Sequence, residues 1–457
     1  MLYTKHVVQR HLRCRGLLNS VARRDNKVRG RVEGAEMQVV QRTSCRICGS
    51  RALTPIISLG DQALASAFVL DDAPVEFPSR KVPLDLIRCD PGLDENACGL
   101  VQLRHSYPKE LIYENYWYMS GVNQTMRDAL TEITQRARQF VSVRTGDIIV
   151  DIGCNDGTML RAYNLTGADL IGFDPASNLS QPDEPFLRIV DFFSEQSFRR
   201  VRDANARAKI ITSIAMFYDL DDPAAFVRDV ASVLHLEGIW IMQFADLPGM
   251  LLNNMYDNIC HEHLLYLHLA PIERMLTEAG LQLVDLEMNA VNGSSYRLFI
   301  RHHNGPVPTT EGLARLQARR KVEANMKLDQ SAPYNRFREM VVANRHALRD
   351  TLKSFKQKGK LVLGYGASTK GNVILQYCDI GTDLLPYLAD RNPRKHGTRT
   401  IGTSIPIISE GDARAMTPDY FLVLPYHFLP EMLDREKAFI ARGGRFIVPV
   451  PTIQLVQ

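Results

Sequence analysis

The sequence of 457 residues predicts an α/β protein with three parts in series. First, apolar runs that end in turn or acidic residues alternate with helical spacing through the central part of the chain. Second, a smaller version of this pattern returns towards the C-terminus. Third, four of the eight cysteines cluster between residues 45 and 98. Strand–helix alternation is typical of a largely parallel sheet covered on both faces, so we expect two such domains behind a small cysteine-rich module.

The composition is that of a soluble globular protein, with 45% hydrophobic and 23% charged residues. The length exceeds that of one ordinary hydrophobic core. A net charge of +4 is small for this size and argues against nucleic acid as a partner. No apolar run is long enough to cross a bilayer. We therefore expect a cytoplasmic protein without nucleic-acid or membrane partners, as a monomer or small homo-oligomer.

The first 36 residues carry nine Lys or Arg against three acidic residues and show no apolar periodicity. A basic, acid-poor start is typical of some organelle addresses. Glu33, Glu36 and the scarcity of serine weaken that interpretation. We expect a disordered tail over residues 1–42, or a stretch upstream of a start at Met37.

The elements follow in order along the chain. Residues 43–110 hold the clustered cysteines and little regular pattern, and a helical, aromatic-rich stretch leads into a central domain over residues 111–305. Its apolar runs predict strands at residues 147–153, 169–174, 187–191, 209–215, 238–244, 282–286 and 296–302. Helical spacing occurs at residues 224–236 and 271–279. A helical bridge is predicted over residues 306–355, and a C-terminal Rossmann-like domain over residues 356–457.

A glycine-containing turn follows the first central strand, where Gly153 and Gly157 precede a helix expected near Met159. Such a turn lets backbone approach a ligand closely at the carboxyl edge of a parallel sheet. The three-glycine dinucleotide pattern is absent. Asp151 and Asp156 suit the amino group of a zwitterionic amino acid.

Two further acidic strand ends follow in sequence. Asp174, followed by Pro175, is placed to bind two ribose hydroxyls, and Asp191 with Phe192 is placed to bind and cover an adenine. Together these residues favour S-adenosylmethionine as a bound methyl donor. The stretch resembles the glycine-rich motif and acidic second strand of class I methyltransferases, which implies a class I Rossmann-like fold. The expected donor-binding residues are Asp151, Gly153, Asn155, Asp156, Gly157, Asp174, Pro175, Asp191 and Phe192.

The cysteine-rich module predicts a zinc site. The two-residue gap between Cys45 and Cys48 lets both thiolates reach one zinc ion, and Cys89 with Cys98 completes a four-cysteine shell. A closed shell leaves no open coordination position, so we expect the zinc to be structural.

Near the end of the central domain, His261, Glu262 and His263 stand together. Two histidines around a glutamate form a candidate general-base cluster, of which one histidine is expected to be structural. The spacing does not fit a zinc-protease pair, whose histidines are four residues apart. Gln243, at the end of a preceding strand, is expected to face the same cleft.

The C-terminal domain contains a strand that runs into glycines and a lysine at the start of a predicted helix, over residues 364–372. Backbone amides, the helix dipole and the cation of Lys370 could together hold phosphates. The spacing is not that of a Walker loop.

As a set, these motifs resemble the sugar-nucleotide C-methyltransferase family, from about Cys45 to the C-terminus. The resemblance implies C-methylation next to a keto group, usually at C3 of a 4-keto-6-deoxy sugar bound as its dTDP or GDP derivative. It also implies that His263 is the base with Glu262 beside it, and that Tyr116 or Tyr118 binds near the reacting atoms. The residues implied to face the nucleotide or its phosphates are Gly364, Gly366, Lys370, Gly371 and Asn372.

The chain departs from the family at Cys260, where several members carry tyrosine, and at His427, where asparagine is expected. These departures bear on the sugar contacts. An alternative is an N- or O-methyltransferase of another small metabolite, whose acceptor is already nucleophilic. A third interpretation, a zinc module that guides nucleic-acid modification, ranks last because the basic excess lies in the N-terminal tail rather than beside the cysteines.

Overall fold

The computed structural model describes residues 39–70, 81–113, 116–163, 167–181 and 183–457. The chain divides into two compact units, Met1–Val40 and Gln41–Gln457. The predicted tail, residues 1–42, lies outside the described residues except for residues 39–42. Among the described helices, none combines the length and the apolar character needed to cross a membrane.

In the described part of the central domain, seven strands form one sheet in the order β13-β14-β11-β10-β7-β8-β9. β14 runs antiparallel to both of its neighbours, and the other pairs are parallel. The strands are β7 (Ile148–Ile152), β8 (Asp169–Phe173), β9 (Leu187–Ile189), β10 (Ala208–Ile214), β11 (Leu234–Ala245), β13 (Leu281–Asn289) and β14 (Ser295–His302). Every strand expected between residues 147 and 302 is present, and the largely parallel sheet is confirmed.

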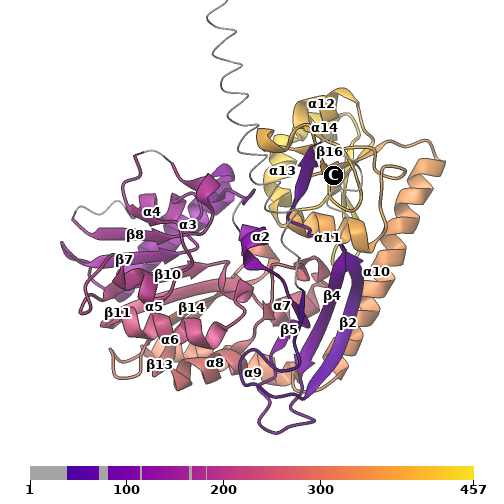
Figure 1. The fold of residues 1–457 in the computed structure, drawn as a ribbon. Coiled ribbons are helices and arrows are strands. Elements are labelled where there is room, and N and C mark those ends of the chain that lie inside the picture. Colours follow the sequence, from indigo (N-terminus) through magenta and orange to yellow (C-terminus); the bar gives the residue numbers. More distant parts are fainter. Residues whose placement is uncertain (1–38, 71–80, 114–115, 164–166, 182) are drawn as a thin grey trace, which may run out of the picture. The chain divides into compact units, whose positions relative to one another are not determined.

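Side chains along β11 point alternately to the two faces of this sheet, and both faces are buried. Ile239 and Ile241 belong to a core cluster with residues of α3 (Gln124–Phe140). Trp240, between them, points to the other face, where its ring lies 6.2 Å from that of Phe226 on α6 (Pro223–Val233). Figure 1 shows α3 and α4 (Thr158–Ala162) on one side of the sheet, and α5 (Glu195–Arg199) and α6 on the other. The helix expected over residues 224–236 ends at Val233, because β11 begins at Leu234.

The strand order reverses between β7 and β10. β7 pairs with β8 on one side and β10 on the other, and successive strands then lead outwards in opposite directions. In open α/β sheets, the crevice at such a switch point lies outside the carboxyl ends of the strands and takes the ligand. The turn from Gly153 to Gly157 follows β7 at this point.

The C-terminal sheet has the order β18-β16-β15-β19-β20-β21. Its first five strands run parallel and β21 is antiparallel to β20. The elements are β15 (Val362–Tyr365), α11 (Thr369–Tyr377), β16 (Leu388–Asp390), β17 (Thr398–Thr400), β18 (Ile407–Ser409), α12 (Glu410–Ala415), β19 (Tyr420–Val423), α13 (Leu429–Arg435), α14 (Lys437–Ala441), β20 (Arg445–Val448) and β21 (Gln454–Val456). A second switch point lies between β15 and β19. The loop after β15 therefore has the same position in this sheet as the glycine turn after β7 has in the central sheet.

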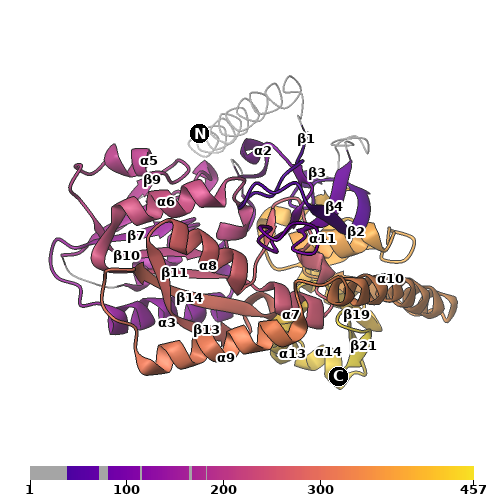
Figure 2. The same ribbon diagram turned by 90° about the horizontal axis from the view of Figure 1, so that it is seen from below.

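Two long helices join these domains, α9 (Thr310–Met326) and α10 (Ala332–Gln357). α9 packs on β13, as Figure 2 shows. α10 runs beside β2 (Leu53–Gln62) of the cysteine module (Figures 1 and 2). The predicted helical bridge is therefore present as two helices.

The cysteine module is more regular than its sequence indicates. β2 and β4 (Val82–Cys89) form a long antiparallel pair, followed by β5 (Val101–Leu103), and the sheet order is β12-β5-β4-β2. The register of β2 shifts between Pro55 and Ile57 and again between Ser58 and Asp61. These irregularities break the two-residue alternation by which a strand is recognised in sequence.

Two strand pairings connect this module to the other domains. β12 (Leu265–Tyr266) comes from the central segment and pairs with β5. β3 (Phe68–Leu70) pairs with β17 of the C-terminal domain.

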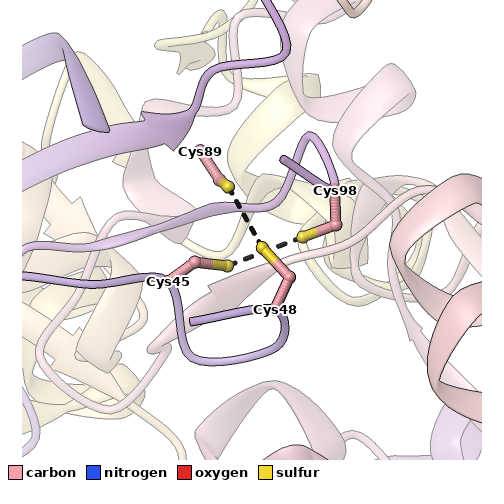
Figure 3. Close-up of side chains that lie close together, drawn as sticks. All are labelled: Cys45, Cys48, Cys89 and Cys98. Atoms are coloured by element: carbon pink, nitrogen blue, oxygen red, sulfur yellow. Dashed lines mark hydrogen bonds between the residues drawn. The ribbon is translucent and has the colours of Figure 1, made fainter. Parts of the chain in front are cut away.

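The four clustered cysteines converge at one end of the module. Cys45 and Cys48 lie in a tight loop, Cys89 ends β4 and Cys98 lies in the following loop, and their sulfurs point towards one another in Figure 3. The Sγ atoms of Cys45 and Cys98 are 3.5 Å apart, as are those of Cys48 and Cys89, and all four lie within 4.8 Å. A tetrahedral shell with Zn–S bonds of about 2.3 Å separates its sulfurs by about 3.8 Å. The spacing fits one zinc ion and is too long for disulfides.

We predict that Cys48→Ala abolishes stoichiometric zinc binding and lowers the midpoint of thermal unfolding, because a structural zinc contributes its binding energy to folding. Zinc content by mass spectrometry and thermal unfolding measure both effects. Cys378→Ala, which removes a buried cysteine outside the cluster, is the control and should retain the metal. Full zinc content in Cys48→Ala would contradict the four-cysteine assignment.

Candidate active site

The glycine turn after β7 adopts a backbone that suits close approach by a ligand. Gly153, Asn155 and Gly157 have φ values of +74°, +50° and +77°. A Cβ on Gly157 would lie 2.4 Å from the ring of Phe186, so a side chain there would displace the turn. The turn thus has a backbone conformation that favours glycine, and it lies at the switch point of the sheet, where open α/β sheets take their ligands.

Two buried carboxylates lie beneath this turn. Asp151 accepts a hydrogen bond from Thr212 Oγ1 at 2.8 Å, and burial raises its pKa to about 7. Asp174 accepts hydrogen bonds from the backbone amides of Asn155 at 2.8 Å and Ala176 at 2.9 Å, one on each oxygen. Pro175 follows in the same loop. Since each oxygen has two lone pairs, Asp174 retains acceptors for ribose hydroxyls.

The side chains of Asn155 and Asp156 hold a neighbouring segment rather than pointing into open space. Asn155 accepts from the amide of Ser120 at 2.9 Å and donates to the carbonyl of Tyr118 at 3.1 Å. Asp156 accepts from the amide of Gly121 at 2.8 Å and, on its other oxygen, from Thr158. The aromatic segment over residues 118–121 is therefore fastened to the glycine turn.

The third acidic strand end is more open. Asp191 pairs with Arg200 at 2.5 Å, and its side chain is 40% exposed. The ring of Phe192 lies 6.4 Å from that of Tyr113, edge to face, and the ammonium group of Lys109 is 3.9 Å from the Phe192 ring centroid. Phe192 thus lies beside the aromatic residues of the reaction site.

His263 is held in one tautomer. Its Nδ1 lies 2.9 Å from the backbone carbonyl oxygen of Asn258. A carbonyl only accepts, so Nδ1 carries the proton and Nε2 keeps its lone pair. Burial, together with the positive charge of Lys370, lowers the pKa of His263 to about 3. The imidazole is neutral at physiological pH and able to accept a proton.

The His263 ring borders a cavity. The ring of Tyr218 packs against it, with centroids 4.2 Å apart. The cavity is lined by Tyr218, Ala245, Leu247, Met250, Asn258, His263, Leu265 and Tyr266.

Glu262 is buried beside this histidine. Burial raises its pKa to about 7, against the hydroxyls of Ser66 and Tyr116, which lower it. Its Oε1 has no hydrogen-bond partner among the described residues. Near neutral pH the carboxyl is therefore close to its titration point and can act as a hydrogen-bond donor.

His261 points into the cysteine module. Its ring lies 4.9 Å from that of Tyr107, edge to face, and Nε2 is 3.5 Å from the carbonyl of Val82. Burial lowers its pKa to about 4. His261 therefore packs against residues of the cysteine module, and the catalytic roles expected of His261 and His263 stay predictions.

Tyr116 and Tyr118 have different surroundings. The backbone of Tyr116 makes two hydrogen bonds with the side chain of Asn178, at 3.0 and 2.9 Å, and its hydroxyl interacts with Glu262. The Tyr118 side chain is 40% exposed. Tyr116 thus contacts Glu262, whereas Tyr118 lies within electrostatic reach of Tyr218, whose ring packs on His263.

Lys370 belongs to the loop that was expected to hold phosphates, and it also lies near the segment that contains His263. Its ammonium group has no hydrogen-bond or ion-pair partner among the described residues. Burial is the main cause of the pKa shifts of His263 and His427, which are lowered, and of Asp257, which is raised. The charge of Lys370 acts on the pKa of all three, so it lies within electrostatic reach of these groups.

The glycines around Lys370 have packing roles. A Cβ on Gly364 would lie 1.9 Å from Leu388, one on Gly366 2.5 Å from Pro425, and one on Gly371 2.7 Å from Leu424. Asn372 donates to the carbonyl of Ala65 at 2.6 Å. These contacts join the loop to its own domain and to the cysteine module.

Gln243 is buried next to the site's edge. Its amide oxygen accepts from Arg297 Nε at 2.9 Å and from Asn289 at 3.1 Å. Both described contacts of the Gln243 amide oxygen are therefore with residues of the central sheet itself.

A metal ion does not fit the reaction cluster well. Donor atoms of Cys260, Glu262 and His263 lie within 4.8 Å of one another. However, the nearby ammonium of Lys370 repels a dication, and a metal on His263 would occupy the free lone pair.

Several residues of the cluster carry no strong sequence signal. Tyr218 and Asp219 lie in the turn η3 (Phe217–Asp219) after β10, at the same sheet edge as the glycine turn. The end of a strand at the switch point is a general signal that could have found them. The contribution of Asn258 is a backbone carbonyl, which its residue type does not reveal.

We predict that Gly157→Ala weakens binding of S-adenosylhomocysteine by about tenfold or more, because both φ and the contact with Phe186 oppose a side chain. Gly146→Ala is the matched control: φ is +86°, with no atom within 4 Å of the added Cβ. Both substitutions cost about 1 kcal/mol of backbone strain, so titration calorimetry isolates the displaced turn. Equal affinities in the two variants would contradict this placement of the donor.

Three family models match consecutive parts of the chain. They are described as "Putative zinc binding domain" over residues 45–113, "Methyltransferase domain" over residues 122–286 and "C-methyltransferase C-terminal domain" over residues 290–451. A curated relative, the C-methyltransferase NovU of Streptomyces niveus, is 27% identical over 414 residues, which are 90% of this chain and 96% of NovU.

Solved structures give weaker matches. Magnesium protoporphyrin IX methyltransferase of Synechocystis PCC 6803 with bound SAM is 14% identical, with a TM-score of 0.28, over 39% of this chain and 79% of that one. The plantazolicin methyltransferase BpumL is 14% identical, with a TM-score of 0.31, over 38% and 84%. These scores are too low to bear on the assignment, which rests on the family models and NovU. The chain is therefore an S-adenosylmethionine-dependent C-methyltransferase, with an N-terminal zinc-binding domain, a methyltransferase domain and the C-terminal domain of these enzymes.

Proposed function

We propose that the acceptor is a 4-keto-6-deoxy sugar carried as its dTDP or GDP derivative, and that it is methylated at C3. In this proposal His263 removes the C3 proton and generates an enolate. The proposed zinc module spans residues 43–110, and the proposed donor-binding domain spans residues 111–305. A helical bridge over residues 306–355 leads to the domain over residues 356–457, which completes the acceptor site.

The observation that carries the proposal is the state of His263. Its Nδ1 proton is committed to Asn258, so the lone pair of Nε2 is the free one beside the cavity. C-methylation requires a base, since the carbon must lose a proton to become a nucleophile. A neutral imidazole with one free nitrogen supplies it.

The electrons of the broken C3–H bond move to the C4 carbonyl oxygen. The ammonium of Lys370 and the protonated form of Glu262 are the groups near His263 that can stabilise negative charge there. Tyr116, which interacts with Glu262, can keep that carboxyl oriented.

The donor turn lies at the carboxyl edge of the same sheet as η3. Asp151, Asp174 and the backbone from Gly153 to Gly157 are the groups proposed to hold the donor. When bound, S-adenosylmethionine supplies an electrophilic methyl group, which the C3 carbon takes as the sulfide leaves. The protein's part is to hold the two carbons close and in line.

A hydroxyl-rich acceptor is supported by buried polar atoms that lack partners among the described residues. Buried polar atoms in folded proteins are nearly always hydrogen-bonded, so a cluster of unpartnered ones favours a polar ligand. Lys370 acts electrostatically on Asp257 and His427, and Glu262 acts on Asp219. The unpartnered atoms include Asp219 Oδ1, Asp257 Oδ2, Asn258 Oδ1 and Nδ2, Glu262 Oε1, Asn372 Oδ1 and His427 Nδ1.

The test is a panel of dTDP- and GDP-linked 4-keto-6-deoxy sugars with a ¹³C-methyl donor, followed by NMR of the product. We expect a new methyl group bonded to C3. His263→Ala should lower kcat by about 100- to 10,000-fold, the usual worth of a positioned base. His303→Ala, at an exposed histidine, should retain activity. A methyl group on oxygen, or full activity in His263→Ala, would refute the proposal.

The charge of Lys370 should be visible in the pH profile. A nearby cation disfavours the imidazolium, so its removal raises the pKa of His263 from about 3 towards its ordinary value of 6.5. We predict that Lys370→Met moves the acid limb of kcat/KM to higher pH, whereas Lys370→Arg leaves it in place. An unchanged acid limb in Lys370→Met would show that the cation does not act on His263.

A further inference from the structure

Arg46 lies between two zinc ligands and extends away from the metal. Its backbone amide donates to Gln102 Oε1 at 3.0 Å, and its side chain is fully buried. The guanidinium donates to the carbonyls of Leu103 and His105 and, at 2.8 Å, to Ser106 Oγ. These bonds fix the direction of the side chain.

The carboxylate that neutralises this buried cation belongs to the methyltransferase domain. Arg46 Nε donates to Asp221 Oδ1 at 3.2 Å, and the same oxygen accepts from Ser106 Oγ at 2.5 Å. Asp221 is half exposed, with a side-chain exposure of 52%.

Asp221 lies two residues after the η3 turn. In that turn, Tyr218 packs on the His263 ring, and burial, together with nearby Glu262, raises the pKa of Asp219 well above its ordinary value. On the other side of His263, β12 is paired with β5 of the zinc module. The η3 turn and β12, which both lie beside His263, are therefore both bound to the zinc module.

We propose that Arg46 and Asp221 act as positioning residues, through which the zinc knuckle holds the Tyr218 turn against His263. This proposal rests on the proposed role of His263 as the base. Loss of the pair would free η3 from the knuckle, so Tyr218 would pack less well against the imidazole. Proton transfer depends on sub-ångström placement, so the rate should fall while donor binding and zinc content persist.

The experiment compares Asp221→Ala and Asp221→Asn with Asp222→Asn in the full chain. Asp222 is the neighbouring carboxylate, which caps α6 by accepting from the amide of Ala225 and does not contact Arg46. The measurements are zinc content, S-adenosylhomocysteine affinity, kcat and KM, and the ¹³Cε1 histidine NMR signal that disappears in His263→Ala.

We expect Asp221→Ala to keep its zinc and donor affinity, to shift the His263 signal and to lower kcat by about 10- to 100-fold with little change in KM. Asp221→Asn, which keeps an acceptor for Ser106 and Arg46, should lie between Asp221→Ala and the wild type. Asp222→Asn should match the wild type in every measurement.

A wild-type His263 signal and kcat in a folded Asp221 variant would overturn the inference. Loss of zinc or of donor binding together with activity would overturn it too, because the pair would then be merely structural. If Asp221→Ala does not fold, Asp221→Asn decides by the same criteria. Since the NMR signal needs no acceptor, failure of the proposed sugar chemistry is distinguished from failure of this inference.

Discussion

Two residues of the central segment, Leu265 and Tyr266, form a strand in the sheet of the zinc module and not in the central sheet. This pairing directly follows Glu262 and His263, so it fixes the course of the chain next to these two residues. The amide of Leu103 donates to the carbonyl of Leu264 at 2.9 Å and extends the same contact. A zinc ion held by the four cysteines would keep the module's loops together and would so support this segment. The donor turn needs no such help, because the switch point of the central sheet creates it.

Burial gives the reaction cluster its chemistry. Desolvation keeps His263 neutral and brings the pKa of Glu262 to about 7, so a base and a hydrogen-bond donor can coexist side by side. Lys370 strengthens the first effect and provides a cation without a fixed partner. Cys260 is fully buried, and burial raises its pKa well above the ordinary value. Because a neutral thiol offers little to an enolate, the proposed reaction assigns that task to Lys370, Glu262 and Tyr116.

The sequence predicted those features that are written locally. The glycine turn follows a continuous apolar strand, and the paired cysteines have a two-residue gap, so a short window was enough for both. The bulged strand β2 was missed because Pro55 and Gly60 interrupt its alternation. The carbonyl of Asn258 and the pair of Arg46 with Asp221 were beyond reach for another reason. Their roles come from contacts between segments that are distant in sequence, and the residue pattern of neither segment predicts such a contact. The direction of His261, into the zinc module, likewise depends on Tyr107 and Val82.

The central claim is that the protein itself removes a proton from carbon before any methyl group moves. The most direct measurement is hydrogen exchange at C3 of the keto sugar in deuterated water, with S-adenosylhomocysteine in place of the donor. The account predicts that wild-type protein replaces the C3 proton with deuterium and that His263→Ala does not. A wild-type protein that methylates the sugar on carbon, yet exchanges no C3 proton above the rate in buffer, would contradict a discrete enolate formed by His263.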